Sequence, residues 1–155
     1  MIKITLNETQ AAIQLKQIAA QLEQPRKLYG LLGESLKKIH NQRFKDQKDP
    51  DGNAWQAVSP RYAAYKAKHK KGNQILKFHG ALSQRTAYNY DDRGVEFGSS
   101  MKYAPVHQNG SRKKSGRGSG IPQRKWLGIN KENEQLLLEK SRQHLQNVIN
   151  KITGR

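Results

Sequence analysis

The chain has 155 residues and no cysteine, and 29 lysines and arginines against 12 aspartates and glutamates give it a formal net charge of +17. This length predicts one domain, residues 1–155, and the lack of thiols excludes disulfides, thiolate zinc sites and cysteine nucleophiles. Apolar residues make up only 34% of the chain, which indicates that much of its surface stays in water or meets a partner.

Two features of the sequence argue against export and against a membrane partner. Residues 1–6 alternate between apolar and polar side chains and lack the continuous apolar segment of a signal peptide. No apolar run approaches the roughly 18 residues that span a bilayer. We therefore expect a protein that stays where it is made and has no membrane partner.

The positive charge is concentrated in the middle of the chain. Residues 52–90 and residues 97–131 contain no aspartate or glutamate but many lysines and arginines. A charge of this size says more about partners than about fold. DNA, RNA, an acidic protein surface or an anionic membrane could each compensate it.

The chain begins with an expected strand and two expected helices. Residues 1–7 alternate as a half-buried strand does, and residues 8–23 predict a helix. The apolar side chains of this helix are Ala11, Leu15, Ile18 and Leu22. Pro25 is well placed to start a second helix, which ends near Phe44. Its apolar stripe consists of Leu28, Leu32, Leu36 and Ile39.

The next elements are short. Residues 49–53 predict a tight turn. Ser59 and Pro60 are typical of an N-cap and the first position of a helix, which we expect to fray at residues 70–72. A further short helix is expected to hold Leu76 and Leu82.

A β-hairpin is predicted over residues 88–97. Aromatic and apolar side chains alternate on both sides of the turn at residues 91–94, and Gly94 is expected to supply a positive φ there. These side chains are Tyr88, Tyr90, Val95 and Phe97.

The last third of the chain combines a polar loop with a helix. Residues 111–120 contain no apolar side chain and predict a flexible basic loop. A C-terminal helix is expected from Lys131, with an apolar stripe of Leu138, Leu145, Val148 and Ile152. The order of elements indicates an α+β fold: a small antiparallel sheet, formed by the N-terminal strand and the central hairpin, packed by several helices.

The sequence offers no constellation suited to catalysis or to metal binding. The 5 histidines fall in different expected elements and form no HxxxH or HxH pair. Asp49, Asp51 and Asn53 alternate as calcium ligands do, but Pro60 stands where the bidentate glutamate of that motif belongs. We therefore predict no catalytic, metal-binding or cofactor-binding residues, no cofactor, and no enzymatic activity.

The basic loop has two interpretations. In one, its cations make non-specific phosphate contacts with DNA, together with Lys68, Lys70 and Lys71, and displace counterions. In the other, the loop keeps the protein soluble or folds against a neighbouring subunit. The loop cations are Arg112, Lys113, Lys114 and Arg117. The first interpretation makes a non-specific nucleic-acid-binding protein the alternative function.

Four local patches carry the most specific residue patterns, and two of them contain a tryptophan whose large apolar face is expected to be buried. The patches are Pro50-Asp51-Gly52 with Trp55; Leu76 with Gly80 and Leu82; Tyr103-Ala104 with His107, Gln108 and Gly110; and Ile121-Pro122 with Arg124, Leu127 and Gly128. Gly80 is expected to let the chain pass close to neighbouring backbone.

Together and in this order, and with Pro60 and Lys66 between the first two, the patches resemble the phage virion morphogenesis family, the tail-completion proteins of the Mu-like G protein type. The resemblance covers residues 44–128. The basic segment between Gly110 and Ile121 departs from the family pattern, so the resemblance says least about the loop.

The resemblance implies a role in late phage assembly, either completing the tail or joining it to the DNA-filled head. Proteins of this type look like relatives of neck and tail-terminator proteins, which work as rings that are often hexameric. It implies other tail or neck proteins and further copies of the chain as partners. The implied location is the cytoplasm of the bacterial host during assembly, or the virion, and no catalytic residues are implied.

Overall fold

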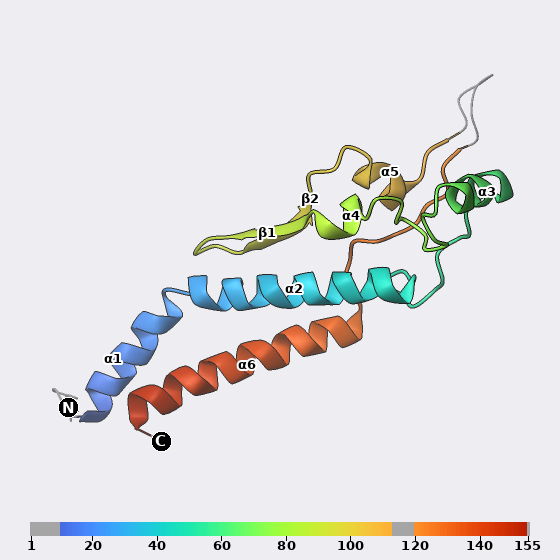
Figure 1. Cartoon of the computed structure of the whole chain (residues 1–155). Coiled ribbons are helices and arrows are strands. Elements are labelled where there is room, and N and C mark those ends of the chain that lie inside the picture. The colour runs from blue at the N-terminus through green and yellow to red at the C-terminus, as the bar shows by residue number, and fades with distance from the viewer. Residues whose placement is uncertain (1–9, 113–119, 155) are drawn as a thin grey trace.

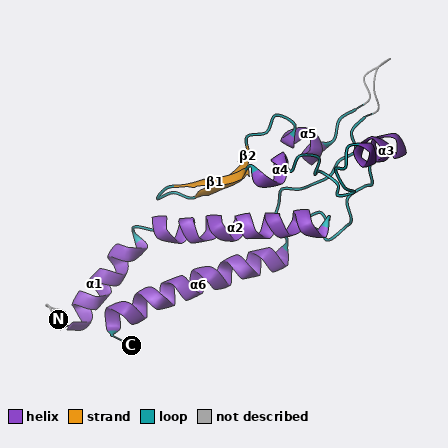
Figure 2. Cartoon of the chain, viewed as in Figure 1, coloured by secondary structure: helices purple, strands orange, loops and turns teal. Residues whose placement is uncertain are grey.

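The computed structural model describes residues 10–112 and 120–154. Within these ranges the chain forms helices and a two-stranded antiparallel sheet, which confirms the α+β class (Figures 1 and 2). The strand expected at residues 1–7 lies outside the described residues, as does most of the basic loop. The elements are α1 (Gln10–Leu22), α2 (Arg26–Asp46), α3 (Pro60–Lys68), α4 (Ala81–Gln84), β1 (Thr86–Tyr90), β2 (Val95–Ser99), α5 (Ala104–Asn109) and α6 (Lys131–Thr153).

The long helix α2 lies at the centre of the molecule. Figure 1 shows α6 running antiparallel to α2 on one side and the hairpin of β1 and β2 lying on the other. The short helices α3, α4 and α5, with their connecting segments, gather at the end of α2 where its last turn lies. The stripe predicted for α2, which consists of Leu28, Leu32, Leu36 and Ile39, is half-buried.

Two glycines in α2 allow the hairpin to approach the helix closely. A Cβ atom at Gly33 would lie 2.2 Å from Cδ2 of Tyr88, and one at Gly30 would lie 3.1 Å from Cζ of Tyr90. Glycine costs about 1 kcal/mol relative to alanine in a helix interior. The packing of the two tyrosine rings on bare helix backbone explains why these residues occur inside a long helix.

We expect Gly33→Ala to lower the free energy of unfolding by about 2 kcal/mol, because the clash with Tyr88 outweighs the gain in helix propensity. Gly30→Ala is the matched control and should change stability by less than about 0.5 kcal/mol, since the slightly tight contact with Tyr90 offsets the gain in helix propensity. In a Tyr88→Ala background, Gly33→Ala should instead stabilise the protein. Urea denaturation of the four variants measures all these values, and destabilisation that persists without the Tyr88 ring would contradict the explanation.

The predicted hairpin is confirmed and is formed by β1 and β2. Tyr88 pairs with Phe97, and Tyr90 pairs with Val95, so the four side chains share one face of the sheet. That face meets α2, where the Phe97 ring stacks on the ring of His40 with centroids 4.3 Å apart.

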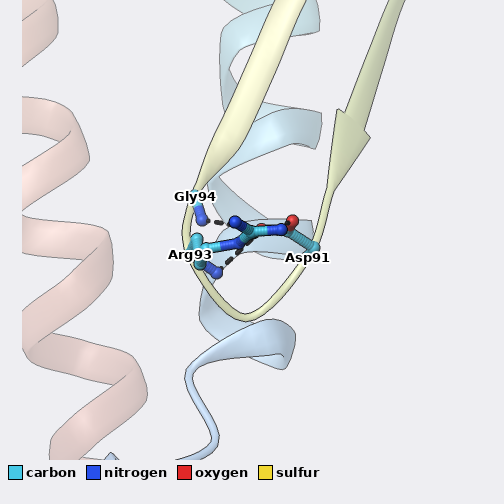
Figure 3. Close-up of polar contacts among 3 residues, drawn as sticks. All are labelled: Asp91, Arg93 and Gly94. Carbon is cyan, nitrogen blue, oxygen red and sulfur yellow. Dashed lines mark hydrogen bonds and ion pairs between the residues drawn. The ribbon is translucent and has the colours of Figure 1, made fainter.

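The turn of the hairpin is closed by a side chain (Figure 3). Oδ1 of Asp91 accepts hydrogen bonds from the backbone N–H groups of Arg93, at 2.7 Å, and Gly94, at 3.1 Å. The prediction of a positive φ at Gly94 is wrong, because φ at this glycine is not positive. The aspartate satisfies the turn backbone without it, as an Asx-turn does.

Helix α3 begins as predicted, with Oγ of Ser59 accepting a hydrogen bond from N–H of Tyr62 and Pro60 in the first turn. It ends at Lys68, and Lys70 has a positive φ of 52°. The next short helix is only partly as expected. Leu82 lies in α4, whereas Leu76 has a φ of 58° and lies outside any helix.

Gly80 also differs from expectation. Its φ is +74°. The atoms nearest to a Cβ at this position would be side-chain atoms of Gln84, in the following helical turn, and not backbone from another segment. The glycine therefore supplies the left-handed conformation that starts α4.

The C-terminal helix α6 starts with a capping box, in which the side chain of Asn130 accepts from N–H of Asn133 and the side chain of Asn133 accepts from N–H of Asn130. The predicted stripe is wrong at its first position, because Leu138 is 62% exposed. Its neighbour Leu137 is half-buried, as are the other three predicted positions, Leu145, Val148 and Ile152.

Helix α1 also leaves apolar side chains in water. Ile18 is half-buried, but Ala11 is exposed, and Leu15 and Leu22 have exposed fractions of 62% and 54%. Periodicity therefore predicted this helix correctly and its packing only in part. Among the described helices, none is both long and apolar enough to cross a membrane.

Motif core and candidate interaction surface

Both tryptophans are buried in the core, as predicted. The core consists of Phe44, Trp55, Leu82, Ala104 and Trp126. The Phe44 ring packs against both indoles, edge-on to Trp55 at 5.5 Å and tilted against Trp126 at 6.2 Å between centroids. Nε1 of Trp55 donates to the backbone oxygen of Lys125, and Nε1 of Trp126 donates to that of Ala104. Each polar indole edge is thus satisfied inside the core.

Gln108 holds the backbone on both sides of the second tryptophan. Its Oε1 accepts from the backbone N–H groups of Trp126, at 3.0 Å, and Leu127, at 2.9 Å. Its Nε2 donates to the backbone oxygen of Leu127 at 2.9 Å. The amide reproduces the hydrogen bonds of a neighbouring strand, and Leu127 packs against the core.

Arg124 is buried and binds backbone. Its Nε donates to the oxygen of Gln56 at 2.7 Å, and its Nη2 donates to that of Ala57 at 3.1 Å. Burial lowers the pKa of Arg124. The group remains charged at neutral pH because the ordinary pKa of arginine lies far above 7. The side chain therefore joins the segment after Trp55 to the segment before Trp126.

Lys66 plays a similar part at α3. It is buried, and its Nζ donates to the backbone oxygens of Gln74, at 2.5 Å, and Lys77, at 3.0 Å. Burial lowers the pKa of Lys66. This lysine fixes the segment between α3 and α4 and is not available to phosphate.

Two of the motif glycines stand where other segments come close. A Cβ at Gly110, whose φ is +73°, would lie 3.0 Å from the backbone of Gln123 and of Ile121. A Cβ at Gly128 would lie 2.9 Å from Cγ of Pro50, which is buried in the first patch. Gly52, with a φ of +87°, serves the turn itself, and Asp51 beside it is exposed. The first and fourth patches therefore pack directly on each other.

A groove of about 900 Å³ opens beside this core. It runs between α3, residues 76–82, α5 and residues 120–124, and no aspartate or glutamate lines it. Seven residues of the four patches contribute to its walls: Leu76, Leu82, Tyr103, His107, Ile121, Pro122 and Arg124.

His107 has a buried ring atom that makes no hydrogen bond. Within the described residues its Nδ1 lacks a partner, and the ring lies edge-on to Tyr103 with centroids 5.9 Å apart. Burial, and then the charge of Arg124, lower the pKa of His107. The ring therefore stays neutral at neutral pH and acts as a packing group.

The comparison with known sequences matches this arrangement of patches to a family. The phage virion morphogenesis family matches residues 6–146, a range that contains all four patches. The chain belongs to the phage virion morphogenesis family. A protein of Escherichia phage Mu named "Putative capsid assembly protein G" is 32% identical over 107 residues, which cover 67% of this chain and 69% of the Mu protein. No solved structure gives a significant match.

In this virion morphogenesis protein the motif residues serve packing. The buried motif side chains lie against each other or against backbone, and we find no nucleophile–base pair among them. In the described part of the chain, no group of three or more histidines, aspartates and glutamates could hold a metal ion. The family residues thus determine the fold around the groove.

Sequence reasoning missed a second set of buried polar residues, on α2. Nη1 of Arg43 donates to the backbone oxygens of Trp126, at 3.1 Å, and Gly128, at 2.8 Å, and Nη2 donates to Oδ1 of Asn133 at 3.2 Å. Nε2 of His40 lies 3.2 Å from N–H of Gly128. Both residues lie on the face of α2 that carries the apolar stripe. This position was the only feature of the sequence that indicated their burial.

The cations singled out from the sequence fall into two groups. Lys68, the last residue of α3, and Lys70, just beyond the helix, are exposed, and Lys71 is half-buried. Arg112 is exposed at the start of the basic loop, and its other cations, Lys113, Lys114 and Arg117, lie outside the described residues. Gly120 and Ile121, where the loop returns, line the groove beside α3.

Proposed function

We propose that this protein is a structural, non-catalytic assembly component that completes the phage tail or joins it to the DNA-filled head. Membership of the virion morphogenesis family supports an assembly role, and the packing use of the motif residues supports a structural one. The name of the Mu protein points to capsid assembly, which is the second candidate. Both functions require binding to other phage proteins in the host cell or in the virion.

We further propose that the protein works as a ring of identical copies. The observation that carries this proposal is α6, a helix of 23 residues that has no buried residue. A helix of this length normally buries an apolar stripe, yet Leu136 and Leu138 of α6 and Leu15 of α1 remain exposed. A contact between two different patches of adjacent copies would cover such side chains and close a ring. Six copies is the number that related neck proteins suggest.

Disruption of the gene in an inducible prophage tests the role. If the protein completes or joins tails, electron microscopy of the lysate should show DNA-filled heads beside separate or aberrant tails. If it acts in capsid assembly, filled heads should be absent. Infectious particles at normal titre would contradict both candidates.

Complementation with single variants tests the apolar surface. Leu138→Glu should fail to restore infectious particles, because it places a charge on the exposed apolar surface of α6. Gln135→Glu, at an exposed polar position of the same helix, adds the same charge and should restore them. Circular dichroism of both purified variants verifies that each keeps the helix content of the unmodified protein. Full complementation by Leu138→Glu would exclude this surface as an interface.

A further inference from the structure

Three aromatic rings lie side by side at α3. The rings of Tyr62 and Tyr65, on the helix, and of Phe78, after it, are nearly parallel, with interplanar angles between 13° and 31°. Their centroids are 6.2, 5.8 and 6.3 Å apart. In a face-to-face column the outer rings would be about twice as far apart as neighbours. A nearly equilateral triangle instead means that the rings spread laterally.

This cluster is accessible although it is aromatic. Tyr62 and Tyr65 have exposed fractions of 41% and 49%, and Phe78 is half-buried. His69 and His79 are exposed at its edges, with His69 4.1 Å from Tyr65 and His79 4.7 Å from Phe78 between ring centroids. Aromatic faces are large apolar surfaces that proteins usually bury, so a cluster of this size in water indicates a binding surface.

Lysines surround the rings. Nζ of Lys71 lies 5.4 Å from the centroid of Phe78 and 3.4 Å from Nδ1 of His79. Lys70, Lys71 and Lys77 line one hollow of about 570 Å³ together with Phe78 and His79. Neither this hollow nor the groove next to it contains a carboxylate. No acidic side chain in the wall of either cavity can therefore form an ion pair with these lysines.

Aromatic faces combined with unpaired lysines suit one class of ligand. Single-stranded nucleic acids offer bases that stack on aromatic rings and phosphates that bind cations. A duplex keeps its bases stacked on each other and would use only the lysines. Protein interfaces are depleted of lysine, whereas nucleic-acid interfaces are strongly positive.

We propose that α3 and residues 77–79 form a binding site for single-stranded nucleic acid, in which bases stack on Tyr62, Tyr65 and Phe78 and the surrounding lysines contact phosphates. The site does not depend on the assembly role, and it lies wholly within described residues. It accounts for the aromatic cluster, which a purely electrostatic contact through the basic loop leaves unexplained.

Fluorescence anisotropy with labelled oligothymidine and with a duplex of equal length, each over a salt series, tests the proposal. The full chain should bind the single strand at least tenfold more tightly than the duplex at 0.15 M salt. Tyr62→Ala/Tyr65→Ala should weaken single-strand binding by roughly tenfold or more, without changing the salt dependence. Lys70→Gln/Lys71→Gln/Lys77→Gln should reduce the slope of log affinity against log salt by about 2.

Two controls separate these effects from misfolding and from general charge. Tyr62→Phe/Tyr65→Phe keeps the rings and should bind as the unmodified protein does. Lys16→Gln/Lys27→Gln/Lys37→Gln removes three exposed lysines from α1 and α2 and should leave the single-strand preference unchanged. Thermal melts establish that every variant folds.

Equal affinity for single strand and duplex, with no effect of the tyrosine replacements, would overturn the proposal. So would a lack of binding together with self-association that Tyr62→Ala/Tyr65→Ala abolishes, which would assign the surface to a second copy of the chain. Neither result bears on the assembly role, which the prophage experiment tests separately.

Discussion

Replacing Trp126 by alanine is expected to lower the free energy of unfolding by about 4 kcal/mol. The indole is almost fully buried against Phe44 and donates to the backbone oxygen of Ala104. Its removal leaves a large cavity and an unpaired carbonyl. Because the total stability of a domain is about 5–15 kcal/mol, this single change is expected to bring the protein close to unfolding.

Trp126→Phe separates the two contributions. It retains most of the apolar contact but removes the N–H donor, so we expect a smaller loss of about 2 kcal/mol. Denaturant unfolding followed by circular dichroism measures both variants, and the slope m must be unchanged for the comparison to hold. A loss below about 1 kcal/mol for Trp126→Ala would show that residues 121–128 contribute little to the core.

Acidification from pH 6.5 to pH 4 is expected to remove about 3 kcal/mol of stability through His40 alone. The ring is only 1% exposed, and burial lowers its pKa from 6.5 to about 4. Nδ1 lies 2.7 Å from the backbone oxygen of Leu36, and Nε2 lies 3.2 Å from N–H of Gly128. This arrangement requires a neutral ring that donates at Nδ1 and accepts at Nε2.

The sign follows from the depressed pKa. Between pH 4 and pH 6.5 the unfolded chain binds a proton at His40 that the folded chain does not, so stability rises with pH across this window. Stability from this group is complete above pH 6.5 and is lost as pH falls toward 4. His107, whose pKa is also lowered, adds a change in the same direction.

The variant His40→Gln isolates the contribution of this ring. Its amide can still accept from Gly128 but does not titrate, so the variant should be less stable at pH 7 and lose about 3 kcal/mol less on acidification. Urea unfolding at intervals between pH 4 and pH 7 measures both proteins. Parallel stability curves would show that His40 does not titrate over this range. His144→Gln on α6 is the control for the loss of a histidine elsewhere in the chain.

Local sequence predicted the elements well because each has its own signal. Ser59 and Pro60 start α3 as expected, and the alternation from Tyr88 to Phe97 predicted the hairpin. The burial of Trp55 and Trp126 followed from their size alone. In these cases the decisive chemistry lies within a few residues of the feature.

Features that depend on distant partners could not be predicted. Arg43 binds carbonyl groups more than 80 residues away, and nothing near it in the sequence indicates them. Glycine is unfavourable in a helix interior, and the contact that explains Gly33 is with Tyr88, which lies far along the chain. In the run Leu136-Leu137-Leu138, periodicity alone could not decide which leucine meets the rest of the molecule.

The way in which the basic loop leaves and rejoins the core makes that loop replaceable. N–H of Ser111 donates to the oxygen of Ile121 at 2.8 Å, and N–H of Ile121 donates to Oγ of Ser111 at 3.0 Å. Both hydrogen bonds are made by the two closing residues, so they do not depend on what is inserted between them. Doubling the length of such an insertion costs only about 0.6 kcal/mol in closure entropy. A segment of another length or charge can therefore be inserted between Ser111 and Ile121 without loss of either closing hydrogen bond.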